Sequence, residues 1–296
     1  MKPEQFQTPL RNKIRSWSQK NPKIHKFSKS LFNTYCKLIG PMHVLPNFII
    51  IGAAKSGTSS LYEYLIQHPS IYKCLVKEPN YFANYFHKNI DWYRSFFPST
   101  LTKFYVEKTL KNKFSTGEAS TQYYWYPHTA ERVKQLLPNV KLIVLLRNPI
   151  ERSFSHYQME VRNGNEKLSF EEAIKKEKER TQGEYEKILS DKLYFSPKYT
   201  MQAYIEKSIY INSIKRWTKY FPLEQFLFVK AEDFYENTTK ELNKILKFLD
   251  LSEFELKKYD VLRKGSYSKL NSQTREELCE FFKPYNEELY RHIGIN

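Results

Sequence analysis

The chain has 296 residues, of which 41% are hydrophobic and 16% aromatic, and this content excludes an unfolded chain and allows a sizeable buried core. The 48 Lys and Arg residues against 32 Asp and Glu residues give a formal net charge of +16, so the protein should attract polyanions in a salt-dependent way. The basic residues are spread along the chain without a recognisable nucleic-acid-binding module, so no nucleic acid is expected as a partner.

The first segment, residues 1–45, is rich in Lys, Arg and Ser and carries scattered apolar residues such as Trp17, Phe27 and Leu31. We interpret it as a basic N-terminal arm that precedes one domain over residues 46–296. A basic amphipathic helix in this arm would touch a membrane surface or a partner, whereas a solvated arm would do neither. The composition favours the solvated arm and leaves peripheral membrane contact open.

An apolar run at residues 48–51 predicts a buried strand that leads directly into the loop Gly52-Ala53-Ala54-Lys55-Ser56-Gly57-Thr58-Ser59. The residues that follow predict an amphipathic helix. A strand, a glycine-bounded loop and a helix N-terminus together form a cradle for a phosphate group. The ATP-binding pattern requires Gly, four residues and then Gly-Lys-Ser/Thr, whereas here the lysine stands two positions before the second glycine. We therefore expect phosphate binding of another kind, with a plain turn as the alternative.

Two further apolar runs, residues 141–146 and 226–229, predict buried strands. Helical patterns accompany these strands at residues 129–137, 150–162 and 237–249. This alternation predicts an α/β fold with a mostly parallel central sheet flanked by helices. Since ligands of such sheets gather at the carboxyl ends of the strands, Lys55 and Arg147 should face a common cleft.

The charged segment at residues 168–191 predicts an exposed helix or helical pair with a solvated face. Neither an internal repeat nor a low-complexity linker divides the chain, so one domain with insertions is the simplest organisation. The aromatic run Tyr123-Tyr124-Trp125-Tyr126 suits either a buried core or stacking against sugar rings, and both interpretations stay open.

Several segments, in the order in which they occur, resemble the sulfotransferases that use 3′-phosphoadenosine 5′-phosphosulfate (PAPS). They are residues 52–59, 77–82, 145–157 and the late Lys264-Gly265-Ser266. The chain looks most similar to the carbohydrate branch, typified by the heparan sulfate N- and 3-O-sulfotransferase domains, because residues 90–98 and 281–290 also have counterparts there. The resemblance covers residues 46–294 and implies a P-loop-like fold.

The resemblance assigns the 5′ end of the nucleotide to the early loop. Lys55 would lie near the bridging oxygen, where negative charge grows as the sulfuryl group departs, and would stabilise that charge. The phosphosulfate would also be held by the backbone N–H groups of Ser56, Gly57, Thr58 and Ser59. A solvated loop lysine is the alternative for Lys55.

The 3′-phosphate is what separates PAPS from ATP, and the resemblance assigns it to Arg147 and Ser155. A strand-end arginine can equally pair with a carboxylate such as Glu151 or Glu118. A late loop would close over the same side of the nucleotide, unless it is ordinary loop sequence; it comprises Lys264, Gly265, Ser266 and Tyr267.

Glu78 resembles the general base that the carbohydrate branch uses toward an acceptor hydroxyl or amine, a role worth roughly a hundred- to ten-thousandfold in rate. A turn or cap residue is the alternative. His68 and His156 are expected to be structural. The family pattern breaks at Ala119, which stands after Glu118 where the heparan sulfate enzymes carry a lysine, and the missing cation weighs against direct transfer of heparan sulfate specificity.

The sequence thus predicts a sulfotransferase that moves a sulfuryl group from PAPS to a hydroxyl, or less readily an amine, of a carbohydrate or other glycan-like acceptor. PAPS is the co-substrate and PAP the product, and no metal is expected because protein cations supply the charge. One alternative is a nucleotide kinase, which the displaced lysine disfavours. The other is a non-catalytic polyanion-binding protein on the same fold, which the charge of +16 would suit.

The cysteines Cys36, Cys74 and Cys279 lie far apart, without the spacing of a disulfide framework or a zinc site. No apolar run approaches the length of a membrane span, and the N-terminus lacks the apolar core of a signal peptide. We therefore expect a cytoplasmic protein.

Overall fold

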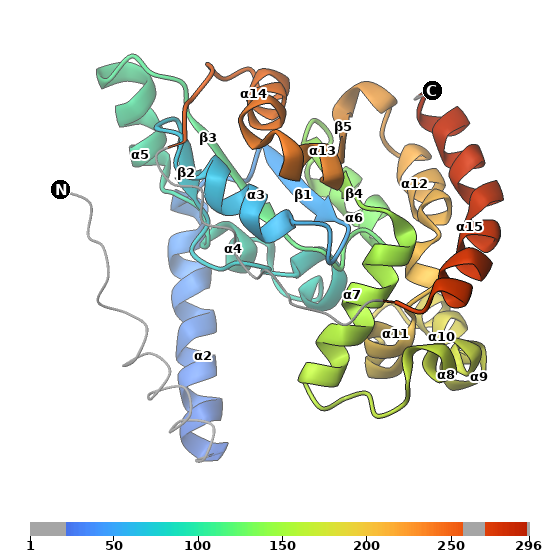
Figure 1. Cartoon of the computed structure of the whole chain (residues 1–296). Coiled ribbons are helices and arrows are strands. Elements are labelled where there is room, and N and C mark those ends of the chain that lie inside the picture. Colours follow the sequence, from blue (N-terminus) through green and yellow to red (C-terminus); the bar gives the residue numbers. More distant parts are fainter. Residues whose placement is uncertain (1–21, 257–269, 295–296) are drawn as a thin grey trace.

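The central element is a five-stranded sheet in which every neighbouring pair of strands is parallel. The computed structural model describes residues 22–256 and 270–294, and Figure 1 shows their arrangement. The strands follow the spatial order β2-β3-β1-β4-β5. Their bounds are β1 (Phe48–Gly52), β2 (Ile71–Lys73), β3 (Ser115–Ala119), β4 (Lys141–Leu146) and β5 (Phe226–Lys230).

Helices surround this sheet (Figure 1). The α-helices are α2 (Pro22–Ile39), α3 (Thr58–Leu65), α4 (Ile90–Arg94), α5 (Thr100–Phe104), α6 (Thr129–Leu136), α7 (Pro149–Arg162), α8 (Phe170–Lys175), α9 (Glu177–Thr181), α10 (Glu184–Ser190), α11 (Pro197–Gln202), α12 (Tyr210–Thr218), α13 (Ala231–Glu236), α14 (Thr238–Phe248) and α15 (Ser272–Ile293). Short turns of other helical types are η1 (Gly40–Met42), η2 (Tyr81–Tyr85), η3 (Tyr105–Thr109), η4 (Glu206–Ser208) and η5 (Leu223–Gln225). Helices α8 to α11 gather near the end of α7, while α12 packs against α15 (Figure 1).

Strand β1 is buried along its whole length because it lies between β3 and β4. A strand of a parallel sheet that is covered on both faces takes apolar residues at successive positions, which explains the continuous Phe-Ile-Ile-Ile run. Its register pairs Ile49 with Glu118 of β3 and Ile50 with Ile143 of β4. The carboxyl ends of these three strands therefore meet at the same edge of the sheet.

Helix α7 begins immediately after β4, and local signals set its start. The side-chain oxygen of Asn148 accepts hydrogen bonds from the backbone N–H groups of Ile150, at 3.0 Å, and Glu151, at 3.4 Å. Pro149 occupies the first turn, where its missing N–H costs nothing. With this start, Arg152 and Ser155 lie three positions apart on one face of the helix.

The predicted N-terminal arm contains helix α2, which packs against α4 at its carboxyl end. Cys36 is buried in the main core, and the ring of Phe32 stacks on Phe96 at a centroid distance of 6.4 Å. The start of α2 projects from the body (Figure 1). No helix in the described part of the chain is long and apolar enough to cross a membrane.

The predicted α/β class with a mostly parallel sheet is confirmed. The three predicted strands correspond to β1, β4 and β5, and the three predicted helices to α6, α7 and α14. Strands β2 and β3 were not predicted. Residues 168–191 form three short helices with a solvated face, and their opposite faces bury Phe170, Glu177 and Ile188.

Candidate active site

The loop between β1 and α3 has a backbone geometry that requires glycine. Gly57 has a φ of 97°, and a Cβ at this position would stand 2.6 Å from the Tyr235 hydroxyl oxygen. A Cβ on Gly52 would stand only 2.5 Å from the Cβ of Tyr124. Lys55 also takes a left-handed conformation, with a φ of 73°. The chain thereby turns sharply into α3, whose first backbone N–H groups have no acceptor within the helix.

Two arginines hold this loop, Arg147 immediately after β4 and Arg152 near the start of α7. Arg147 donates from Nη1 to the backbone oxygen of Lys55, at 3.1 Å. Arg152 donates from Nε to the backbone oxygen of Ala54, at 3.2 Å. The loop is therefore fixed against the end of β4 and the start of α7.

Glu78 is held beside the loop by contacts from two other segments. The ammonium group of the preceding Lys77 donates to the side-chain oxygen of Ser59, at the start of α3. Thr121 donates from Oγ1 to Oε1 of Glu78, at 3.4 Å. Glu78 and Asn80 both have positive φ angles, 57° and 49°. The chain around Glu78 is thus tightly turned, and a hydrogen bond connects it to the start of α3, directly after the loop from β1.

Glu118 is a buried carboxyl group on β3 that accepts hydrogen bonds from three hydroxyl groups. Ser120 donates to Oε2 at 2.5 Å, and Tyr93 and Tyr123 donate to Oε1 at 2.6 and 2.9 Å. Burial raises the pKa of Glu118 to about 7, against these hydrogen bonds, which lower it. The negative charge of nearby Glu78 adds to the rise. Glu118 therefore changes its charge near neutral pH.

Two of these hydroxyl groups connect Glu118 to the segment that follows Glu78. Because Ser120 gives its proton to Glu118, its oxygen is open to accept the backbone N–H of Asn80, at 3.1 Å. In the same way the hydroxyl of Tyr123 accepts the backbone N–H of Phe82, at 3.4 Å. An ionised Glu118 fits both chains of hydrogen bonds, since a carboxylate only accepts. We infer that Glu118 positions the segment that carries Glu78.

Arg147 and Ser155 come from the end of β4 and from α7, and both line the same cavity. Glu151, one alternative partner of Arg147, lies 3.9 Å from its Nη2 and also pairs with Arg275. Glu118, the other alternative partner, accepts hydrogen bonds from three hydroxyl groups instead. The distance between Nη2 of Arg147 and the Glu151 carboxylate is longer than a hydrogen bond, so Glu151 does not occupy the hydrogen-bond donors of Arg147.

A cavity of about 750 Å³ joins these groups, within the range of roughly 300 to 1,000 Å³ that is usual for small-molecule sites. The predicted site residues that line it are Lys55, Gly57, Thr58, Ser59, Glu78, Arg147 and Ser155. Ser56 belongs to the loop, but its buried side chain does not line the cavity. The late loop lies outside the described residues; it comprises Lys264, Gly265, Ser266 and Tyr267.

The cavity also has lining residues to which the sequence analysis gave no role, among them Arg152, Lys207 and Tyr235. Arg152 precedes Ser155 by one helical turn, so helix periodicity could have indicated it. Lys207 lies in the short turn η4, and no sequence pattern marks it. The described residues include no group of three or more His, Cys, Asp and Glu that could hold a metal ion.

His156 lies among three cations of the cavity wall. Its pKa is well below the ordinary value, because burial, and then the charges of Lys207, Arg152 and Lys55, disfavour protonation. Arg152 donates from Nη2 to Nδ1 of His156, at 3.0 Å, which requires that nitrogen to be unprotonated. His156 is therefore a neutral imidazole in a positively charged wall. His68, by contrast, lies away from the cavity lining and contacts the backbone of Ser252.

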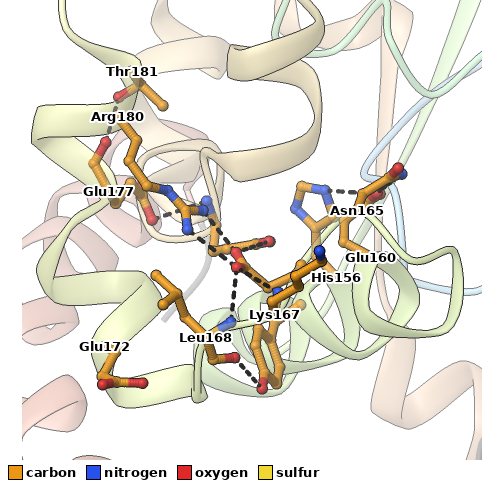
Figure 2. Close-up of polar contacts among 12 residues, drawn as sticks. His156, Glu160, Asn165, Lys167, Leu168, Glu172, Glu177, Arg180 and Thr181 are labelled. Carbon is orange, nitrogen blue, oxygen red and sulfur yellow. Dashed lines mark hydrogen bonds and ion pairs between the residues drawn. The ribbon is translucent and has the colours of Figure 1, made fainter.

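The acidic residues next to this wall are held by partners of their own (Figure 2). Oε1 of Glu160 lies 3.8 Å from Nε2 of His156, and Oε2 accepts from Nδ2 of Asn165, at 2.7 Å. Glu166 accepts two hydrogen bonds from Arg180, at 3.2 and 2.7 Å. These contacts tie α7 to the segment that follows it, and that segment to α9.

Comparisons with known proteins agree with this geometry. Residues 45–283 match the family model described as "Sulfotransferase domain". The membrane-associated sulfotransferase kil1 of Dictyostelium discoideum is 29% identical over an alignment that covers 92% of this chain and 70% of that protein. Human heparan sulfate glucosamine 3-O-sulfotransferase 3B1 is 29% identical over 84% of this chain and 64% of its own length, so the chain spans less than two thirds of that relative.

A crystal structure of a sulfotransferase from Alicyclobacillus acidocaldarius superimposes with a TM-score of 0.64 at 28% identity, covering 86% of this chain and 97% of that chain. The resemblance noted in the sequence is thereby confirmed, and so is the fold that it implied.

Proposed function

The chain belongs to the sulfotransferase domain family, and on this basis we propose that it moves a sulfuryl group from PAPS to a hydroxyl or amine of a carbohydrate acceptor. The observation that carries the proposal is the convergence of Lys55, Glu78, Arg147 and Ser155 on the same cavity. The names of relatives that sulfate heparan sulfate glucosamine support a carbohydrate as the acceptor.

Two sets of groups that line the cavity suit the two anionic ends of the nucleotide. Lys55 and the backbone N–H groups at the start of α3 would hold the 5′-phosphosulfate, since a helix N-terminus and a cation both favour negative charge. Arg147 and Ser155 would bind the 3′-phosphate through charge-assisted hydrogen bonds. A nucleotide with a single phosphorylated end would leave one of these groups unused, so the site favours PAPS over ATP.

The side chains also suit an in-line transfer. Glu78 would accept the proton of the acceptor hydroxyl or amine as the acceptor atom forms its bond to sulfur. The bond between sulfur and the bridging oxygen breaks at the same time, and the electron pair goes to the phosphate of adenosine 3′,5′-bisphosphate (PAP). Lys55 would stabilise this growing charge. Thr121, by donating to Oε1, would keep the Glu78 carboxylate turned to the site.

The test is incubation of the full chain with labelled PAPS and a panel of glycans, lipids and small alcohols, followed by mass spectrometry of the products. We expect PAP and a sulfated glycan. Sulfation restricted to a lipid or small alcohol would replace the acceptor class but not the reaction. A folded protein that binds PAP and transfers sulfate to nothing would instead be a non-catalytic polyanion binder.

A thermal-shift measurement separates the proposal from a kinase. A ligand that binds the folded state at a hundred times its Kd stabilises that state by about 2.7 kcal/mol. PAP should therefore raise the melting temperature at micromolar to millimolar concentration, whereas magnesium-ATP should not. The opposite result would favour the kinase.

A further inference from the structure

Lys207 is a buried cation in the cavity wall that the proposed transfer does not use. The residue is 7% exposed, lies in η4 and lines the cavity. Its Nζ donates to the backbone oxygen of Thr200, at 2.5 Å, and lies 4.8 Å from the ring centroid of Trp125 and 5.8 Å from that of Tyr199. The aromatic rings favour a positive charge but do not neutralise it.

Within residues 22–256 and 270–294, no ion pair joins Lys207 to a carboxylate. Glu177, Glu160 and Glu206 are near enough to favour its charge, but each has another partner, which for Glu206 is Tyr199. Glu160 accepts a hydrogen bond from Asn165, and its other oxygen lies 3.8 Å from Nε2 of His156 (Figure 2). Glu177 accepts backbone N–H groups in the segment before Lys207, namely those of Tyr204, Ile205 and Glu206. Lys207 lines the cavity, and its ammonium group has hydrogen-bond donors that no protein carboxylate fills.

A buried ammonium without a counter-ion is costly, and a protein commonly meets that cost by lowering the pKa of the group. The pKa of Lys207 is well below its ordinary value, first because of burial and then because of Arg152. His156 is neutral and therefore supplies no negative charge that would balance the ammonium group of Lys207. An oxyanion in the cavity would remove the cost, since it would pair with the ammonium and accept its remaining hydrogen bonds.

We propose that Lys207 forms an oxyanion subsite in the cavity, for a sulfate, sulfonate or carboxylate group, distinct from the 3′-phosphate site at Arg147 and Ser155. This inference rests on the proposed function and extends it to substrate recognition. The oxyanion has two sources of the same chemistry: the sulfuryl group of PAPS, or an acidic group on the acceptor.

The first experiment follows sulfate itself. The melting temperature of the PAP-saturated protein is measured with sodium sulfate and with sodium chloride at equal ionic strength, so that PAP fills the 3′-phosphate site. The wild type and an exposed-lysine control on α11, Lys198→Met, should be stabilised by sulfate beyond chloride. In Lys207→Met the apparent sulfate affinity should fall about tenfold or more, as expected when a charged hydrogen-bond donor is lost. Lys207→Arg should keep the response.

The same experiment distinguishes a structural role. If Lys207 served only to hold Thr200, then Lys207→Met would lower the melting temperature without sulfate and would leave the sulfate increment intact, which would overturn the proposal. We expect the unliganded variant to melt at or above the wild-type temperature, because a buried amine whose charged form is costly has been removed. Should Lys207→Met fail to fold, Lys207→Gln provides the same comparison. A wild type without any sulfate increment refutes the subsite with no variant needed.

A second experiment identifies the source of the oxyanion. If the sulfuryl group is the ligand, the wild type should bind PAPS about tenfold or more tightly than PAP, and Lys207→Met should bind the two equally. If the acceptor supplies it, both nucleotides should bind unchanged, while the KM of acidic acceptors rises about tenfold and that of neutral acceptors stays the same. A variant with unchanged affinities, KM and kcat would overturn the proposal. The sulfate titration repeated without PAP remains informative even if PAP does not bind and the proposed function fails.

Discussion

The substitution Glu118→Gln should change how the stability of the protein depends on pH. Glu118 is fully buried on β3, and this burial raises its pKa from 4.5 to about 7 despite three hydroxyl donors. The folded protein then holds a proton that the unfolded chain has already released. Its contribution to stability is therefore fully present below about pH 4.5 and is lost as the pH rises through about 7.

The shift determines the size of the effect. At roughly 1.36 kcal/mol per pKa unit, the whole window corresponds to about 3 kcal/mol, most of which falls between about pH 5 and about pH 8. The variant does not titrate at this position. Denaturant unfolding at the two pH values should therefore show that the wild type loses roughly 2 to 3 kcal/mol more than Glu118→Gln, since groups that do not interact with Glu118 cancel in the comparison.

An exposed control, Glu224→Gln, should follow the wild type at both pH values. Equal losses in wild type and Glu118→Gln would refute the reasoning, because Glu118 would then be ionised throughout the range. The hydrogen bonds to Asn80 and Phe82 add a kinetic expectation: Glu118→Gln should lower kcat while PAP affinity stays within about twofold, since the base moves but the nucleotide contacts do not.

Three further substitutions test the assigned roles. Glu78→Gln should lower kcat roughly a hundred- to ten-thousandfold, measured with labelled PAPS, and should leave the PAP affinity from calorimetry unchanged; a variant with normal kcat would remove Glu78 as the base. Arg147→Met should weaken PAP binding by about 1.5 to 3 kcal/mol and adenosine 5′-phosphate binding far less, whereas equal losses for both would argue against a 3′-phosphate contact. Gly57→Ala should cost about 1 to 2 kcal/mol of stability, because its φ of 97° is unfavourable for alanine, and an unchanged unfolding midpoint would contradict the loop geometry.

The sequence predicted the parts of the fold whose burial shows in their composition. Strands β1 and β4 lie inside the sheet, so their residues are apolar at successive positions and stand out. Strand β3 is equally buried, but its sequence, Ser-Thr-Gly-Glu-Ala, is polar and short. Its glutamate is tolerated inside because Tyr93 and Tyr123, together with Ser120, donate to it, and the partners from other segments cannot be identified before the chain is folded.

The same distinction applies to the candidate site. Lys55, Glu78, Arg147 and Ser155 belong to contiguous motifs, and the structure brings all four to the same cavity. Lys207 arrives there through η4, where its neighbours in sequence are ordinary polar residues. Lys207 lies against the rings of Tyr199 and Trp125, and Trp125 comes from a distant part of the sequence. This contact exists only in the folded chain, so the sequence could not indicate it.

The most direct test of the account is calorimetric titration of the folded full chain with PAP. The account predicts one-to-one binding that requires Arg147 and the loop around Lys55, because the cavity offers cations and hydroxyl donors to both phosphates. Absence of any PAP uptake by folded protein would contradict the assignment of the cavity to a nucleotide phosphorylated on both sides of its ribose, and with it the proposed transfer of sulfate.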